Sequence, residues 1–131
     1  MKTAAVVVRI LLGLVFTIFG LNGFLQFLHM PPPPEPAMAF FGALAATGYM
    51  IKLVFATQLI AGVLLLIGLF VPLALALLAP VIVNIFLFHV FLAPEGLPLA
   101  IVVVTLELLL VAAHRDAFAP MLRPRTPQPA A

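Results

Sequence analysis

Two apolar stretches that lie close together in the sequence decide the fold: residues 51–70, IKLVFATQLIAGVLLLIGLF, and residues 73–92, LALALLAPVIVNIFLFHVFL. As helices rising about 1.5 Å per residue, both are long enough to cross the roughly 30 Å hydrocarbon core of a bilayer. Neither shows the alternation of apolar and polar residues that marks a strand of a membrane barrel. Because unpaired backbone groups cannot face lipid, both stretches are predicted to be transmembrane helices.

Two further segments of this kind lie on either side, at residues 6–28 and 98–114. Pro72 and Pro98 stand near the starts of their helices, where a missing backbone donor is harmless. The short corner before the third segment predicts a tight antiparallel hairpin, and Pro80 is expected to kink the third helix. Four spans with mostly short loops predict an all-α fold, an up-down bundle of four transmembrane helices.

The longer connection between the first two spans begins with a proline-rich run, Pro31–Pro36, which is expected to be extended and rigid. The apolar segment 37–49 that follows is too short to span and is predicted to be a short interfacial or re-entrant helix. Residues 120–131 are rich in proline and are predicted to form a disordered cytoplasmic tail. Residues 1–119 are therefore expected to form a single membrane domain.

The composition excludes a soluble domain, because 66% of the residues are hydrophobic and only 8% are charged, against about 25% charged residues in soluble domains. A net charge of +2 is too small to indicate nucleic-acid binding. The chain has no cysteine, which excludes disulfides, thiolate metal sites and iron–sulfur ligation. Any redox role would therefore need a cofactor or a partner.

The basic residues predict the orientation. Five of the six flank the spans at the side of the two termini: Lys2, Arg9, Arg115, Arg123 and Arg125. Only Lys52 lies at the opposite side. The positive-inside rule therefore predicts that both termini are cytoplasmic.

Six polar side chains within or near the spans are candidate ligand-binding residues: Asn22, Gln26, Gln58, Asn84, His89 and Glu107. Polar groups in a spanning helix are costly, and ionisable ones are functional candidates. Most of the six are expected in the outer half of the membrane. If the helix face that carries each of them points into the bundle, the six would line one cavity that opens toward the outside. The alternative for the amides is structural, since interhelical hydrogen bonds contribute about 0.6 to 2 kcal/mol each.

Glu107 is the one acid in the membrane interior, at roughly 10 Å from the cytoplasmic side. No basic residue is expected at its depth. We therefore expect Glu107 to be largely protonated at neutral pH and to donate a hydrogen bond to Asn84 or another amide. A functional and a structural role remain equally open.

Two smaller features complete the sequence pattern. His29 and His89 both fall near the outer surface, but without a third ligand they predict no metal site, and hydrogen-bonded interfacial histidines are expected instead. Gly13, Thr17 and Gly20 form a smooth helix face, which predicts close packing against another helix of this chain or of a second copy.

Several strings carry a family resemblance when taken in order: Asn22-Gly23-Phe24, Pro31–Pro36 with Glu35, Ala45–Tyr49, Lys52, Pro80–Asn84, Phe88-His89, Ala93–Pro98, Glu107, Arg115-Asp116 and Phe118. This set, from about Arg9 to Pro120, resembles short bacterial members of the DoxX family. The resemblance implies a four-helix protein of the bacterial inner membrane. The family takes its name from a subunit associated with thiosulfate:quinone oxidoreductase. Some relatives are encoded near enzymes that detoxify catechols and quinones. Most members have no established activity.

One departure from the family pattern stands out. Many relatives carry a glutamate in the second helix where this chain has Gln58. If that acid moves protons in the family, this chain lacks the function or depends on Glu107 alone.

Three functions follow from these observations. The first is an accessory or quinone-binding subunit of a membrane redox system, which is not catalytic alone. Amide and acid donors would hold the quinone. A partner protein, either in the membrane or bound at its surface, would supply the electrons. The alternative is a non-catalytic membrane scaffold that binds partners through residues 31–49 outside the membrane and through its smooth helix faces within it. A second copy of the chain is one candidate partner for those faces. Transport of a small solute ranks lowest, because no inverted repeat is visible.

Overall fold

The computed structural model describes residues 2–130, and within them it contains helices and no strand. Its four long helices are α1 (Lys2–Leu25), α3 (Met50–Ile67), α4 (Val71–Phe91) and α5 (Leu97–Ala113), the last preceded by a single 3-10 turn, η1 (Pro94–Gly96). Each long helix, α5 together with η1, is long and apolar enough to cross a membrane. The prediction of an all-α four-helix bundle is confirmed, and the chain has the architecture of a small multi-pass membrane protein.

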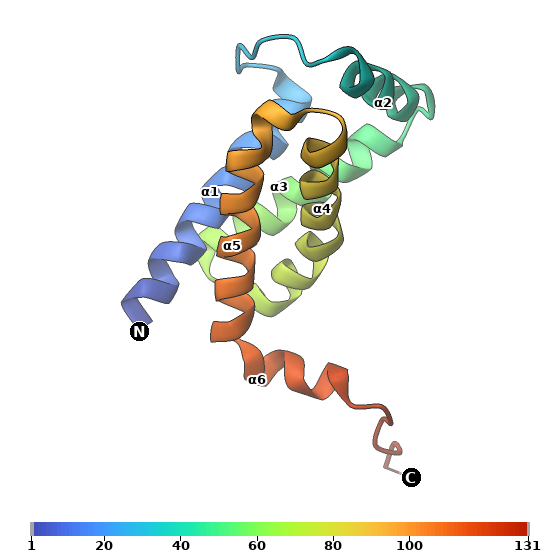
Figure 1. The fold of residues 1–131 in the computed structure, drawn as a ribbon. Helices are drawn as coiled ribbons and strands as arrows, with labels where there is room; N and C mark the ends of the chain where they lie inside the picture. The colour runs from blue at the N-terminus through green and yellow to red at the C-terminus, as the bar shows by residue number, and fades with distance from the viewer. Residues whose placement is uncertain (1, 131) are drawn as a thin grey trace.

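The four helices form an up-down bundle in which each packs against two neighbours (Figure 1). α1 lies against α3 and α5, and α4 lies against the same two helices. The core between them is built from large fully buried side chains: Leu12, Phe16, Leu65, Leu75, Leu78 and Leu110. Only 22–28% of each spanning stretch is buried, so most of the apolar side chains face outward, as contact with a lipid bilayer requires.

The closest packing in the bundle is between α1 and α3, where glycines replace side chains. A Cβ atom on Gly20 would lie 2.7 Å from the backbone nitrogen of Leu59, and one on Gly62 would lie 2.6 Å from that of Thr17. Gly13 makes a similar approach to Leu66. The smooth face of the first span thus packs against a helix of the same chain.

The shorter helix α2 (Glu35–Ala46) lies at the end of the bundle where α1 ends and α3 begins (Figure 1). Phe40 and Phe41 contact Phe88 of α4, with ring centroids 5.6 and 5.2 Å apart. The helix begins two residues before the predicted 37, because Pro36 is tolerated in its first turn. Thr47 closes its other end by donating to the carbonyl of Leu44.

Backbone conformation explains where the spans end. Gly68 takes a left-handed conformation (φ 76°) after α3, and the amides of Gly68 and Leu69 both donate to the carbonyl of Leu64, which is a common way to end a helix. The span predicted at 51–70 therefore stops at Ile67. α1 likewise ends at Leu25, before the predicted 28, because Gln26 is left-handed (φ 50°).

The third span and the elements after the fourth differ from their predicted bounds by a few residues. α4 begins at Val71, two residues before the predicted 73, and continues as one helix through Pro80. After α5, a short helix α6 (Arg115–Phe118) and a 3-10 turn η2 (Ala119–Leu122) come before residues 123–130, which have no regular secondary structure. The regular structure thus reaches three residues, 120–122, into the segment predicted to be disordered.

Candidate functional site

A cavity of about 290 Å³ lies between α4 and α5. It is lined by Ala79, Ile82, Val83, Phe86 and Leu87 from α4 and by Val104, Glu107, Leu108 and Val111 from α5. Val83, Leu87 and Leu108 on its rim are exposed, so the cavity opens on the lipid-facing surface of the bundle. We call it the α4–α5 groove.

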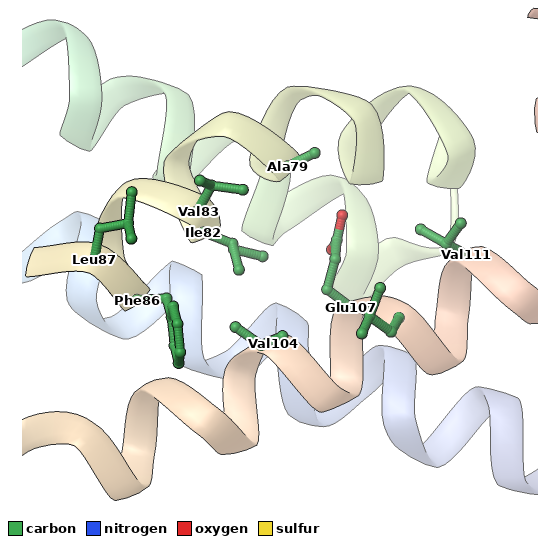
Figure 2. A pocket seen from close by; sticks show the side chains of 9 residues that line it. Ala79, Ile82, Val83, Phe86, Leu87, Val104, Glu107 and Val111 are labelled. Carbon is green, nitrogen blue, oxygen red and sulfur yellow. The ribbon is translucent and has the colours of Figure 1, made fainter. Parts of the chain in front are cut away.

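Among residues 2–130, Glu107 is the only polar residue that lines the α4–α5 groove. It is buried, at 5% exposure, and neither carboxyl oxygen has a hydrogen-bond partner among the described residues. Figure 2 shows its side chain extending from α5 toward α4, where Ala79 and Ile82 lie. Most buried polar groups in proteins are hydrogen-bonded, so this carboxyl is an unused hydrogen-bonding group beside the groove. Neighbouring side chains cover both of its oxygens, so a ligand in the groove would reach them only after the Glu107 side chain turned toward it.

The periodicity of α5 places Glu107 there. Ala100, Val103 and Leu110 are buried on the same helix face, seven and four residues before Glu107 and three after it. These aliphatic neighbours pack into the bundle, and Glu107 is buried because it lies on the same helix face. The surroundings favour the neutral acid, because an isolated carboxylate among apolar side chains is strongly destabilised.

The expected hydrogen bond from Glu107 to Asn84 is wrong. Asn84 is exposed on the outer face of α4 and does not line the α4–α5 groove. Gln58 is buried on α3, on the face of Ala61 and Leu65 that points into the core, and it does not line the groove either. Periodicity along an apolar helix did not predict the direction in which each of these amides points.

The other candidates lie near the end of the bundle beside α2. The side-chain oxygen of Asn22 accepts a hydrogen bond from the amide of Leu28 (2.8 Å), which secures the chain after α1. Gln26 lines a second cavity of about 280 Å³, together with Tyr49 and Lys52. The six candidate residues are therefore not brought together around one cavity.

His89 stabilises the turn between α4 and η1. Its Nδ1 atom lies 3.0 Å from the carbonyl oxygen of Ala93, and its ring packs edge-on against Phe88. A Cβ atom on Gly96 would overlap the imidazole of His89, so the glycine allows this close approach. Within residues 2–130, no cluster of three metal-ligating side chains includes His89 or His29.

Sequence reasoning missed the role of Arg9. Its guanidinium donates hydrogen bonds from Nη1 to the carbonyls of Leu65 and Leu66 at the end of α3. These are carbonyls of the last helical turn, whose partial negative charge attracts a cation. From the sequence, the position of Arg9 near the start of a span predicted only which side of the membrane that end faces. The packing of α1 against α3 is needed to show that Arg9 caps the end of α3.

The α4–α5 groove can hold an apolar ligand by packing, and a rotation of the Glu107 side chain would bring one hydrogen-bond donor, the protonated acid, to that ligand. Comparison with protein-family models, with curated proteins and with solved structures finds no match to this chain. The function is therefore argued from the geometry of the groove.

Proposed function

We propose that this chain binds a lipophilic carbonyl compound, and a quinone in particular, in the α4–α5 groove, as an accessory subunit of a membrane redox system. The observation that carries the proposal is the buried carboxyl of Glu107, which has no partner among the described residues in a cavity with otherwise apolar walls. A protonated carboxyl donates one hydrogen bond, and a quinone carbonyl accepts one.

The size and opening of the groove suit this class of ligand. A volume of about 290 Å³ is near the lower end of ligand cavities, which run from about 300 to 1,000 Å³. It accommodates a substituted ring but not a long tail. Because exposed Val83, Leu87 and Leu108 form the rim, an isoprenoid tail would leave sideways into the lipid.

The chain would contribute binding and orientation in this role. The side chains that line the groove are aliphatic groups, one phenyl ring and one carboxyl, none of which carries a redox couple under physiological conditions. Electrons would therefore reach or leave the quinone through a partner protein.

The same proposal includes the DoxX family, the bacterial inner membrane and cytoplasmic termini. The ordered strings from Arg9 to Pro120 support the family and the compartment. The up-down arrangement supports termini on one side, because α1 begins and α5 ends at the same end of the bundle (Figure 1). The excess of basic residues at that end supports the cytoplasmic side.

Quinone binding tests the proposal. A short-tailed quinone is added to the purified protein in detergent, and the shift of the unfolding temperature is titrated. We expect Glu107→Leu to weaken binding about tenfold, because it removes the one hydrogen-bond donor. Glu107→Gln should bind more tightly than Glu107→Leu, because its amide still donates. The control is Glu95→Gln, which changes an exposed acid of the turn η1 and should bind like the wild type.

A second readout asks where the quinone lies. An apolar carbodiimide, which modifies protonated carboxyls within membranes, should label Glu107, and bound quinone should block the labelling. Equal quinone affinity in all variants, or labelling that quinone does not reduce, would exclude quinone binding in this groove. The scaffold alternative would then be the better account, with residues 31–49 as its binding segment.

A further inference from the structure

Asn84 lies inside the membrane-spanning part of α4 and faces outward. It is thirteen residues from Val71 and seven from Phe91, the ends of the helix, which places it roughly 20 Å from one end and 10 Å from the other. Its side chain is exposed. A carboxamide has two donor hydrogens and an acceptor oxygen, and all of them would face hydrocarbon if only lipid covered this surface.

The chain itself does not satisfy this amide. None of the side-chain hydrogen bonds formed within residues 2–130 involves Asn84. Its neighbours on the outer face of α4 are exposed apolar side chains: Leu73, Leu77, Leu87 and Phe91. A polar group in the middle of such a face favours a protein partner rather than lipid alone.

Two residues beside Asn84 allow a close approach. Ala76 and Pro80 are also exposed and precede Asn84 at intervals of four, so the three lie along one stripe of α4. Both have short side chains. Pro80 also has no N–H for the carbonyl of Ala76, so a second polar group on this stripe lacks its helical partner.

We propose that the outer face of α4 binds the same face of a second copy, forming a parallel dimer about a two-fold axis along the membrane normal. Copies inserted by the same signals have the same orientation and depth, so such an axis brings each Asn84 opposite its counterpart. The carboxamide is self-complementary, because each can donate to the oxygen of the other. A lone asparagine in an apolar helix seam is known to fix register and oligomeric state.

This inference does not depend on quinone binding, because Asn84 is outside the α4–α5 groove. The chain has no native cysteine, so a single introduced cysteine can form a disulfide only between copies. Leu77 lies seven residues before Asn84 on the same face and is 41% exposed. Leu109 on α5 is 53% exposed and serves as the matched control, at a similar distance from the same end of the bundle.

The experiment uses the full chain in liposomes under mild oxidation. Leu77→Cys should form a covalent dimer and Leu109→Cys should not. Adding Asn84→Leu to Leu77→Cys should largely abolish the cross-link. Equal cross-linking of both cysteine variants would indicate random collision and overturn the proposal, as would no cross-link at Leu77→Cys.

A reversible measurement gives the strength of the contact. Fluorescence energy transfer between labelled copies, followed as the protein is diluted in lipid, should show that Asn84→Leu raises the dissociation constant about tenfold. Asn84→Gln should retain part of the affinity. At a dilution where both proteins are monomeric, Asn84→Leu should unfold at the same temperature as the wild type. The Asn84 side chain forms no hydrogen bond within the monomer that would contribute to its stability. An unchanged dissociation constant for Asn84→Leu would overturn the proposal.

Discussion

Glu107 owes its position to the side chains around it rather than to a partner. Val103 and Leu110 bury the same face of α5 and carry the carboxyl into the bundle, where neither oxygen is hydrogen-bonded within the described chain. A neutral acid is tolerated in such a place, but the ionised form is not. Binding that depends on the acid as a donor should therefore weaken as the pH rises far enough to ionise it.

Glycine substitutions provide a residue-scale test of the packing between α1 and α3. Gly20→Ala should lower the free energy of unfolding by about 1 to 3 kcal/mol, because the new methyl group meets the backbone of Leu59 and the two helices must separate. Gly42→Ala is the control. It adds the same methyl group on α2 with nothing within 4 Å, and it should stabilise by up to about 1 kcal/mol through helix propensity. Reversible unfolding in detergent measures both, and equal effects would show that the close approach of α1 and α3 does not limit stability.

The candidate residues show what the sequence can and cannot predict at this scale. Hydropathy identified Glu107 as the one acid within the predicted spans. The direction of a side chain depends on which faces of each helix are buried, and apolar residues surround Asn84 and Glu107 alike. In a membrane the apolar side chains cover both the core and the lipid face, so the amphipathic pattern that orients a soluble helix is weak.

At the scale of the elements, the end of α3 depends on two residues far apart in the sequence. Gly68 supplies the left-handed conformation after the helix, and Arg9 of α1 donates to the carbonyls of Leu65 and Leu66. A Cβ atom on Gly68 would lie 2.7 Å from the Arg9 guanidinium. The hydrogen bonds of Arg9 thus link α1 to the corner between α3 and α4.

Arg9→Gln should loosen this corner. Loss of the cation at the helix end is expected to cost about 1 to 2 kcal/mol and to speed hydrogen exchange at the amides of Gly68 and Leu69. Lys2→Gln removes an equal charge from an exposed position at the start of α1 and should leave these exchange rates unchanged. If both variants exchange alike, the contact with the carbonyls of α3 contributes nothing to the corner.

The elements themselves were the most predictable part of the molecule. Stretches of about twenty apolar residues specify spanning helices almost regardless of detail, and all four were found. Their ends were less predictable. Proline in a first turn extended α2 and α4 toward the N-terminus, and Gln26 ended α1 by adopting a left-handed conformation that glutamine rarely takes.

At the scale of the whole molecule, the site arises from how the helices pair. α1 and α3 are held together by glycines, whereas α4 and α5 present larger side chains to each other and leave the α4–α5 groove between them. The sequence predicted four spans in up-down order but not which pairs pack most closely. A cavity lined by two helices could therefore not be located before the pairing was known.

The whole molecule offers two membrane-facing features with separate roles. The α4–α5 groove presents a buried acid, and the outer face of α4 presents Asn84. The first is proposed to bind a quinone and the second to bind another copy. A dimer along α4 would leave Glu107 in place, because Asn84 lies outside the α4–α5 groove, although Leu87 borders both surfaces.

The infrared spectrum of the full chain in a bilayer tests the central claim most directly. The difference between the wild type and Glu107→Gln isolates the signal of this one carboxyl. At neutral pH we expect the carbonyl stretch of a protonated acid, and we expect this band to move to lower frequency when quinone is added, because a new hydrogen bond forms. A carboxylate signal at neutral pH, or a protonated band that quinone does not move, would contradict quinone binding by a protonated Glu107.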